Sequence, residues 1–229
     1  MRQTWHDLLF AHWPVGADQL RPLVPARIAL DTFEGQCWIG VVPFRMSGIR
    51  GRGLPALPAL SSFPELNLRT YVHYDGKPGV YFFSLDAANL PAVWAARTFF
   101  HLPYFHAGMT STEQNGSIFY ASRRYGDSAE FHGRYGPVSE AALRKKGSIE
   151  HCLTERYCLY TIHDGQVYRG DIHHLPWPLQ DGQAEFEQNT VAAAAGVTLP
   201  AVPPLLHFAR RLDVLIWPLR RADPAGARV

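Results

Sequence analysis

Lysine is nearly absent from this chain of 229 residues: Lys77, Lys145 and Lys146 are the only ones, and arginine supplies the rest of the 22 basic side chains. Lys77 lies in the turn-like segment GKPG, and the other two lie in the polar stretch ALRKKGSIE. An imine-forming lysine needs desolvation or a neighbouring cation to lower its pKa. Lys145 and Lys146 are cationic neighbours of each other, but the polar residues around them indicate a solvent-exposed segment. We therefore expect no lysine-based covalent catalysis.

Motifs of several common enzyme classes are also missing. The chain has no GxSxG nucleophile elbow, no GxGxxG dinucleotide loop and no GxxxxGK[ST] phosphate loop. Its 11 histidines form no HxH or HExxH pair, whereas a catalytic zinc site needs three converging protein ligands. We therefore expect no cofactor and no metal.

Cysteine, charge and apolar runs predict the compartment and the partners. Three cysteines without a C-x-x-C pair argue against a disulfide framework and fit a reducing compartment. No apolar run reaches the ~18 residues of a membrane span, and the first residues lack a signal-peptide pattern. With a net charge of +2 and scattered arginines, no basic stripe for nucleic acid is evident. The expectation is a cytoplasmic protein that binds neither membranes nor nucleic acid, with its oligomeric state left open.

Turn signals divide the sequence into short runs rich in aromatic and β-branched residues. Asp-Gly and Asn-Gly pairs between such runs are the strongest short hairpin signals. They predict hairpins over residues 66–86, 106–124 and 156–173. One helix is predicted over 89–100, with Asn89 as its N-cap and Pro91 in the first turn.

These elements predict a mainly β protein with a few short helices. Long strands joined by hairpins favour a single antiparallel β-barrel or a folded-over sheet. We place this one domain at residues 1–218. Residues 219–229, LRRADPAGARV, are expected to form a disordered tail.

Residues 63–74, FPELNLRTYVHY, carry the clearest functional pattern. Glu65, Asn67, Arg69 and Tyr71 occupy alternate positions, with apolar side chains between most of them. A strand sends alternate side chains to opposite faces, so one face carries a carboxylate, an amide, a guanidinium and a phenol. This face is either the wall of a ligand pocket or a solvated face with an incidental ion pair. A register error of one residue exchanges the two interpretations.

Two further polar residues come from other segments. Arg156, in LTERYCLY, is expected to lead a strand that also carries Cys158 and Tyr160 on the same face. Its neighbour Glu155 allows a charge-assisted pair, which serves either a site or the closure of a barrel end. Tyr104 follows Pro103 at a helix-to-strand corner, a position from which a side chain can point into a barrel.

Four segments together resemble the DUF2071, or YqjF-like, family: FPELNLRTYV followed by KPGVYFFSLDA, then ARTFFHLPYFHAGM, LTERYCLY and HLPWPLQ. The resemblance runs from HWPV near the start to DVLIWPL near the end. It implies the acetoacetate decarboxylase-like fold, a cone-shaped and largely antiparallel β-barrel around an internal cavity. The decarboxylases carry a Pro-Lys-Lys motif whose first lysine forms an imine. The matching residues here are Pro103, Tyr104 and Phe105, so the resemblance does not carry that activity.

With this fold, Arg69 is expected to hold a substrate carboxylate or enolate. Glu65 is expected to orient Arg69 or to accept a proton, since burial raises the pKa of a carboxyl. Asn67, Tyr71, Tyr104 and Arg156 are the expected ligand-binding residues. Three classes of function stay open: an enzyme acting on a small carboxylate or oxo acid by acid-base chemistry, a non-catalytic binding or sensing barrel, and a fold relic with a structural polar network.

Overall fold

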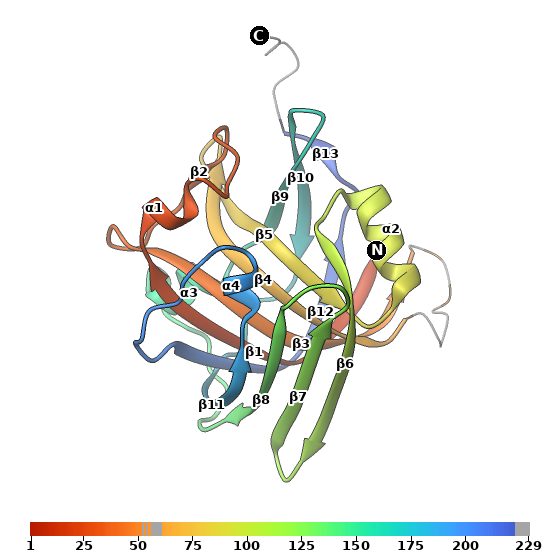
Figure 1. Ribbon diagram of the computed structural model, residues 1–229, viewed down its shortest axis with the longest axis vertical. Coiled ribbons are helices and arrows are strands. Elements are labelled where there is room, and N and C mark those ends of the chain that lie inside the picture. The colour runs from red at the N-terminus through yellow and green to blue at the C-terminus, as the bar shows by residue number, and fades with distance from the viewer. Residues whose placement is uncertain (52, 54, 56–60, 223–229) are drawn as a thin grey trace.

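The computed structural model describes residues 1–51, 53, 55 and 61–222. They form a mainly β protein with one large sheet and a few short helices (Figure 1). Its thirteen strands, within the described residues, are β1 (Arg2–Val15), β2 (Ala29–Leu30), β3 (Cys37–Arg50), β4 (Phe63–Tyr74), β5 (Lys77–Ala87), β6 (Tyr104–Gln114), β7 (Ser117–Arg124), β8 (Glu130–Pro137), β9 (Cys158–His163), β10 (Gln166–His173), β11 (Gln180–Asn189), β12 (Leu205–Ile216) and β13 (Arg220–Arg221). The helices are α1 (Ala17–Leu20), α2 (Leu90–Phe100), α3 (Ile149–Thr154) and α4 (Val191–Ala194). The predicted fold class is confirmed.

All three predicted hairpins are present. They are β4–β5, β6–β7 and β9–β10, and each turns on its Asp-Gly or Asn-Gly pair. Asp75 has φ 50° and Gly76 has φ 70°, the left-handed pair that a two-residue turn needs to match the strand twist. The long predicted helix is α2, in which the Asn89 side chain accepts a hydrogen bond from the Ala92 amide at 3.0 Å.

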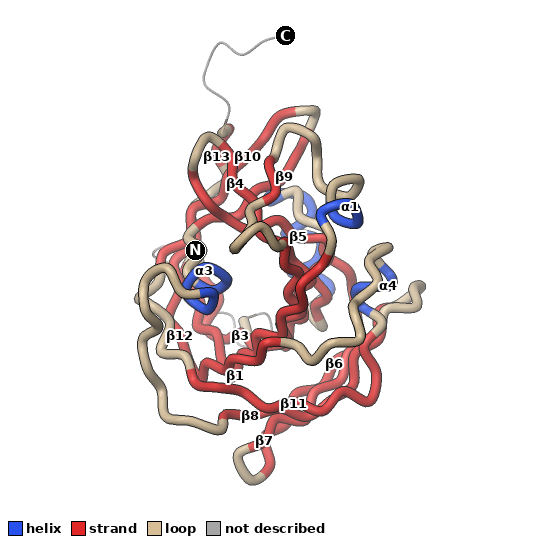
Figure 2. Tube along the Cα trace, turned by 90° about the vertical axis from the view of Figure 1, so that its left-hand side faces the viewer, coloured by secondary structure: helices blue, strands red, loops and turns tan. Residues whose placement is uncertain are grey.

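Two closed circuits of strands share one run of the sheet. The strand order is β13-β10-β9-β5-β6-β7-β8-β11-β12-β1-β3-β4-β2, and β4 also pairs with β5 while β10 also pairs with β12. The first circuit therefore runs from β5 through β6, β7, β8, β11, β12, β1, β3 and β4. The second runs through β9 and β10 instead of β6, β7, β8 and β11. Figure 2 shows the strands curving round this closed arrangement.

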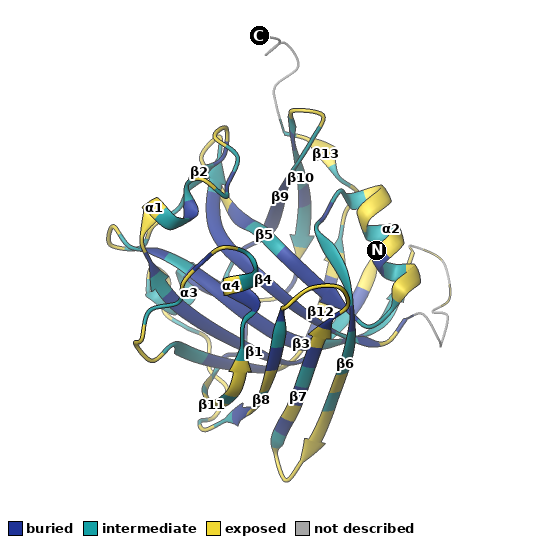
Figure 3. Cartoon of the chain, in the orientation of Figure 1, coloured by how far each residue is buried: buried dark blue, intermediate teal, exposed yellow. Residues whose placement is uncertain are grey.

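Strand alternation gives the two circuits different interiors. Leu66 and Leu68 of β4 pack with Ile118, Phe131 and Phe208 into the main hydrophobic core, on the β7–β8 side. The residues between them on β4 point to the β9–β10 side. Both faces of β4 are buried along most of the strand, as its dark blue colour in Figure 3 shows, so neither face is solvated.

Three details depart from the sequence predictions. The sheet is not wholly antiparallel, because β5 pairs in parallel with β6 and with β9. The start of the expected disordered tail is ordered: Arg220 and Arg221 pair with β10, and the Arg220 guanidinium contacts Asp171 at 2.7 Å. Residues 223–229 lie outside the described part of the chain. Arg156 does not lead a strand, because α3 ends at Thr154 and β9 begins only at Cys158.

None of the helices in the described residues is long and apolar enough to cross a membrane.

Candidate functional site

The second circuit contains a pocket of about 440 Å³. Its walls come from β1, β3, β4, β5, β9, β10 and the end of β12, with α2 across one side. Glu65, Asn67 and Arg69 all line it, together with Tyr104 and Arg156. The alternate polar residues of β4 therefore face the pocket rather than solvent, which excludes the solvated-face interpretation of this strand.

Glu65 is paired with a phenol rather than with a guanidinium. Tyr104, the first residue of β6, donates its hydroxyl proton to Oε2 of Glu65 at 2.7 Å. Burial raises the pKa of Glu65 to about 8, although the hydrogen bond from Tyr104 acts in the opposite direction. Burial also raises the pKa of Tyr104 well above its usual value. With its pKa raised to about 8, Glu65 favours its protonated form at neutral pH.

Arg69 lies among aromatic rings and has no counter-ion within the described residues. Its guanidinium carbon is 5.2 Å from the centre of the Phe10 ring and 5.7 Å from that of Tyr71. Its Nη2 donates to the Leu153 carbonyl at 3.5 Å, and the Tyr71 hydroxyl is a further polar contact, whereas its Nε has no partner in the described part of the chain. The expected contact with Glu65 is wrong, because four residues along a strand separate their backbones by roughly 13 Å. A buried arginine, 9% exposed as a whole residue and without a carboxylate partner in the described chain, is suited to an incoming anion.

Arg156, the second predicted cation, is already neutralised. Its guanidinium forms an ion pair with Asp31 and donates to the Cys152 carbonyl at 2.5 Å and to the Cys152 sulfur at 3.0 Å. Although Arg156 lines the pocket, its charge is matched by the protein itself. The expected partner Glu155 instead accepts hydrogen bonds from Tyr157 and from the Trp177 amide.

Tyr71 lies behind the pocket rather than on its lining. Its hydroxyl shares a 2.5 Å hydrogen bond with Nε2 of His12, a fully buried histidine on β1. Burial, and then Arg69, lower the pKa of His12 well below its usual value, so the imidazole is neutral. Gly40 opposite makes room for this pair, since a Cβ there would lie 3.0 Å from the imidazole. Tyr71 thus closes the Arg69 end and supports the guanidinium through its ring.

Asn67 lies between the two ends of this strand face. Its side-chain oxygen is buried without a hydrogen-bond partner in the described residues. Orphaned buried acceptors are uncommon in folded proteins. Together with Nε of Arg69, this makes two buried polar atoms without a hydrogen-bond partner in the described residues, two positions apart on β4.

The sequence interpretation missed the aromatic wall contributed by DIHHLPWP. His174 and Trp177 line the pocket, and the His174 ring stacks on Tyr157 with ring centres 4.7 Å apart. Nδ1 of His174 donates to the Leu175 carbonyl at 2.7 Å, and burial lowers the pKa of its ring. The adjacent histidines and the HLPWP motif were visible signals, but only the turn after β10 brings His174 into the pocket.

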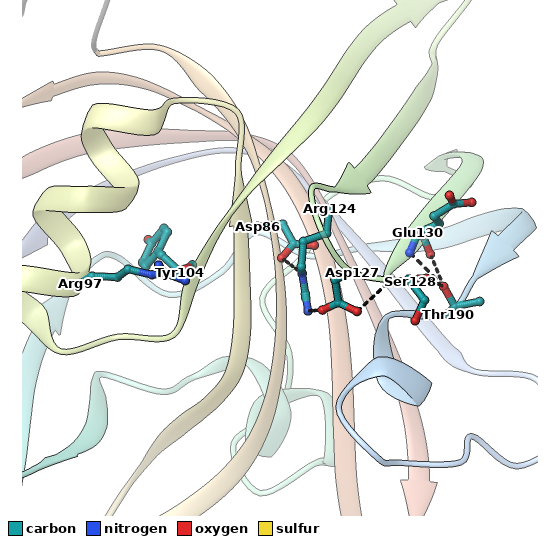
Figure 4. A network of polar contacts seen from close by, with 8 residues as sticks. All are labelled: Asp86, Arg97, Tyr104, Arg124, Asp127, Ser128, Glu130 and Thr190. Atoms are coloured by element: carbon teal, nitrogen blue, oxygen red, sulfur yellow. Dashed lines mark hydrogen bonds and ion pairs between the residues drawn. The ribbon is translucent and has the colours of Figure 1, made fainter.

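A separate buried polar network lies on the other face of β5 (Figure 4). Arg124 of β7 donates to Asp86 at 2.8 Å and to Asp127 at 2.6 Å, and its guanidinium stacks 4.0 Å above the Phe105 ring. Burial raises the pKa of Asp86 to about 6, against the opposing effect of Arg124. This network ties β5 to β7, and none of its three charged members lines the pocket. A structural polar network of this kind was one of the three alternatives for the polar residues of β4.

No lysine lines the pocket, and Lys77 instead contacts Asp171 at 2.8 Å. Within the described residues, no group of three or more His, Cys, Asp or Glu side chains is placed to hold a metal ion.

The family model named DUF2071, described as an uncharacterized conserved protein, matches residues 2–213. The chain belongs to the DUF2071 family. One DUF2071 relative, the uncharacterized protein YqjF of Bacillus subtilis (strain 168), is 54% identical over 222 residues, which cover 96% of this chain and 92% of YqjF.

Solved structures with the same fold have little sequence in common with this DUF2071 chain. The enduracididine biosynthesis enzyme MppR complexed with pyruvate matches with a TM-score of 0.67 and 9% identity, over 97% of this chain and 90% of that one. An acetoacetate decarboxylase-like enzyme from Sphingomonas wittichii RW1 has a TM-score of 0.65 at 12% identity, over 97% and 92%. Acetoacetate decarboxylase from Legionella pneumophila subsp. pneumophila str. Philadelphia 1 has a TM-score of 0.63 at 11% identity, over 99% and 89%. These likenesses establish an acetoacetate decarboxylase-like fold.

Proposed function

We propose that the pocket binds a small organic carboxylate through Arg69, and that Glu65 and Tyr104 act on it as a lysine-free acid-base pair. The observation that carries the proposal is the guanidinium of Arg69, which has no carboxylate partner within the described residues. A buried charge without a partner is costly, and a bound carboxylate would supply two oxygens for its bare N–H groups. The unpartnered side-chain oxygen of Asn67 is an acceptor, so it suits a hydroxyl or amine N–H elsewhere on the ligand and not the carboxylate itself.

Glu65 is the acid of the proposed pair. A carboxyl group with a pKa near 8 keeps its proton at pH 7 and can donate it, or a hydrogen bond, to a carbonyl or enolate oxygen of the ligand. The carboxylate left behind still accepts the Tyr104 hydroxyl hydrogen bond, which stabilises it until the proton returns. An oxo acid whose carbonyl lies several carbons from its carboxylate offers the carboxylate for Arg69 and the carbonyl for Glu65, two rows away on β4. The complex of MppR with pyruvate, on the same fold, supports the broader class of oxo acids.

Binding is tested by thermal shift with a panel of carboxylates and oxo acids on wild type and Arg69→Gln. A ligand at 100-fold its Kd stabilises the folded state by about 2.7 kcal/mol. We expect this shift in wild type and its loss in Arg69→Gln. The control is Arg123→Gln, which removes an exposed arginine far from the pocket and leaves the shift intact. An equal shift in Arg69→Gln contradicts the proposed anchor.

Catalysis is separated from simple binding by Glu65→Gln. This variant keeps the shape of the side chain and an acceptor for Tyr104 but has no proton to transfer. Incubation of each bound oxo acid with wild type, followed by NMR, reports turnover or exchange of its α-protons with deuterium. Loss of that exchange in Glu65→Gln with binding retained supports the enzyme. A wild type that binds but never exchanges or converts a ligand supports the binding or sensing barrel.

A further inference from the structure

We propose that the ligand of this pocket is an amphipathic monocarboxylate, with its carboxylate at Arg69 and an apolar tail of roughly eight to twelve carbons reaching the α2 side. This inference rests on the proposed function, whose site it extends by naming the class of ligand. It comes from the order of residues along the pocket wall.

The polarity of the pocket wall changes stepwise along three neighbouring strands, β3, β4 and β5. Strand register sets Arg69 opposite Gly40 and Phe82, and the next inward row joins Asn67 to Val42 and Leu85.

The following row joins Glu65 to Phe44 and Ala87, and the last pairs Phe63 with Met46. Polar character on β4 thus runs from cation to amide to neutral acid to aromatic ring. Successive inward residues on a strand are roughly 6.6 Å apart, so the wall from the Arg69 row to the Phe63 row is roughly 20 Å long.

The end of the wall opposite Arg69 offers apolar surface and space. Met46 and Phe63 lie there with Ile49 and with Ala92 from the start of α2. Ala95 and Ala96, further along α2, also line the pocket. Alanine side chains leave room that a bulkier helix face would fill. The outer face of α2 has large side chains instead, as Trp94 is 64% exposed. The small side chains of α2 are therefore confined to the face that borders the pocket.

Size and polarity together exclude a very small acid as the best fit. A volume of about 440 Å³ lies in the range of pockets that hold drug-sized ligands, roughly 300–1,000 Å³. An acid the size of pyruvate occupies the Arg69 row and leaves the rows of Phe44 and Met46 without contacts. Burying apolar surface provides most of the affinity of such pockets, so each added methylene in these rows tightens binding.

A second carboxylate at the far end of the ligand has little to bind. Among the described residues, the basic side chain that lines that end is Arg50, which is half-exposed and bonded to the Gly48 carbonyl at 3.5 Å. A charge at the end of the tail also has to pass the apolar rows. A monocarboxylate is therefore favoured over a dicarboxylate of the same length.

The test is calorimetry with butanoate, hexanoate, octanoate, decanoate and dodecanoate, each on wild type, Arg69→Gln and Ala95→Phe. We expect Kd to fall about fourfold per added methylene until the pocket is filled, and then to level off. Ala95→Phe fills the α2 end, so it weakens decanoate at least tenfold and leaves butanoate unchanged. Ala193→Phe is the matched control, because Ala193 is an exposed alanine on α4 outside the pocket.

The outcomes separate the tail from the anchor. Two results would contradict the apolar-tail proposal and leave the Arg69–carboxylate contact supported. In one, the acids need Arg69 but bind equally at every length. In the other, octanedioate binds more tightly than octanoate. If Arg69→Gln binds every acid as wild type does, or if no acid binds wild type, the proposed function fails and the tail with it. A melting curve checks each variant, and Ala96→Leu, a smaller addition, replaces Ala95→Phe if the latter does not fold.

Discussion

Tyr104 of β6 and Glu65 of β4 are 39 residues apart in sequence and share a 2.7 Å hydrogen bond inside the pocket. The phenol stands where the sequence resemblance aligns the imine-forming lysine of the decarboxylases. A neutral hydroxyl therefore faces Glu65, whose pKa burial raises to about 8. Arg69, another buried residue of the pocket wall, has no carboxylate partner within the described residues.

Arg69→Met is expected to leave the free energy of unfolding unchanged or to raise it by about 1–2 kcal/mol. The variant keeps packing against Phe10 while removing a buried charge without a carboxylate partner in the described chain. Arg124→Met is the contrasting variant, because it leaves Asp86 buried without its ion-pair partner, and it should cost about 3–5 kcal/mol. Urea denaturation measures both. Equal losses would show that Arg69 is a structural residue and would remove the main support for the anchor.

The pH dependence of stability should carry the signature of Glu65. Its pKa is about 8 in the folded state and near 4.5 when exposed, so the folded state binds the extra proton between these values. The stabilisation is therefore complete below pH 4.5 and is lost as the pH rises through 8, at up to about 1.4 kcal/mol per pH unit.

Urea titrations of wild type and Glu65→Gln from pH 6 to 9 check this. The difference between the two proteins should fall with rising pH and level off above 8. All other titratable groups are the same in both proteins, so their contributions cancel in the difference. A difference that is flat over this range would mean that Glu65 is ionised at neutral pH.

Tyr104→Phe is expected to raise the pKa of Glu65 further. The Tyr104 hydroxyl stabilises the ionised carboxylate, so its removal leaves burial unopposed by that hydrogen bond. Carbon-13 NMR of glutamate-labelled protein follows the titration, with Glu65→Gln identifying the signal. Tyr157→Phe, which breaks the Tyr157–Glu155 hydrogen bond, is the matched control and should leave the Glu65 midpoint where it is. A midpoint that stays fixed or moves down in Tyr104→Phe would contradict the assigned pairing.

Gly79→Ala should weaken the parallel contact between β5 and β9. A Cβ at this position would lie 2.8 Å from the Cys158 carbonyl oxygen and 2.7 Å from the Tyr160 ring, so the strands must separate. We expect a loss of about 1–3 kcal/mol in the free energy of unfolding. Gly108→Ala meets the hydroxyl of the exposed Tyr125, which can swing away, and should stay within about 0.5 kcal/mol of wild type. A Gly79→Ala protein as stable as Gly108→Ala would show that β5 and β9 adjust freely.

Local patterns predicted the hairpins and the inward face of β4, because turn conformation and side-chain alternation are fixed by neighbouring residues. The partners of the inward residues were beyond such patterns. Glu65 bonds to Tyr104 across the β4–β5–β6 wall, and Arg156 pairs with Asp31, which is 125 residues away. The sequence suggested Glu65 and Arg69 as a pair because they share a strand face, but their spacing along that strand keeps them apart.

The order of strands has a consequence for behaviour at high concentration. Unpaired edges are where sheets of different molecules join and aggregate, and long flat edges are the most prone. The outermost strands of this sheet, β2 and β13, are only two residues long, and β13 is the arginine pair Arg220–Arg221. The additional pairings of β4 with β5 and of β10 with β12 provide hydrogen-bond partners for backbone groups of the strands next to these edges. A large apolar pocket can thus coexist with a sheet that offers other molecules little to extend.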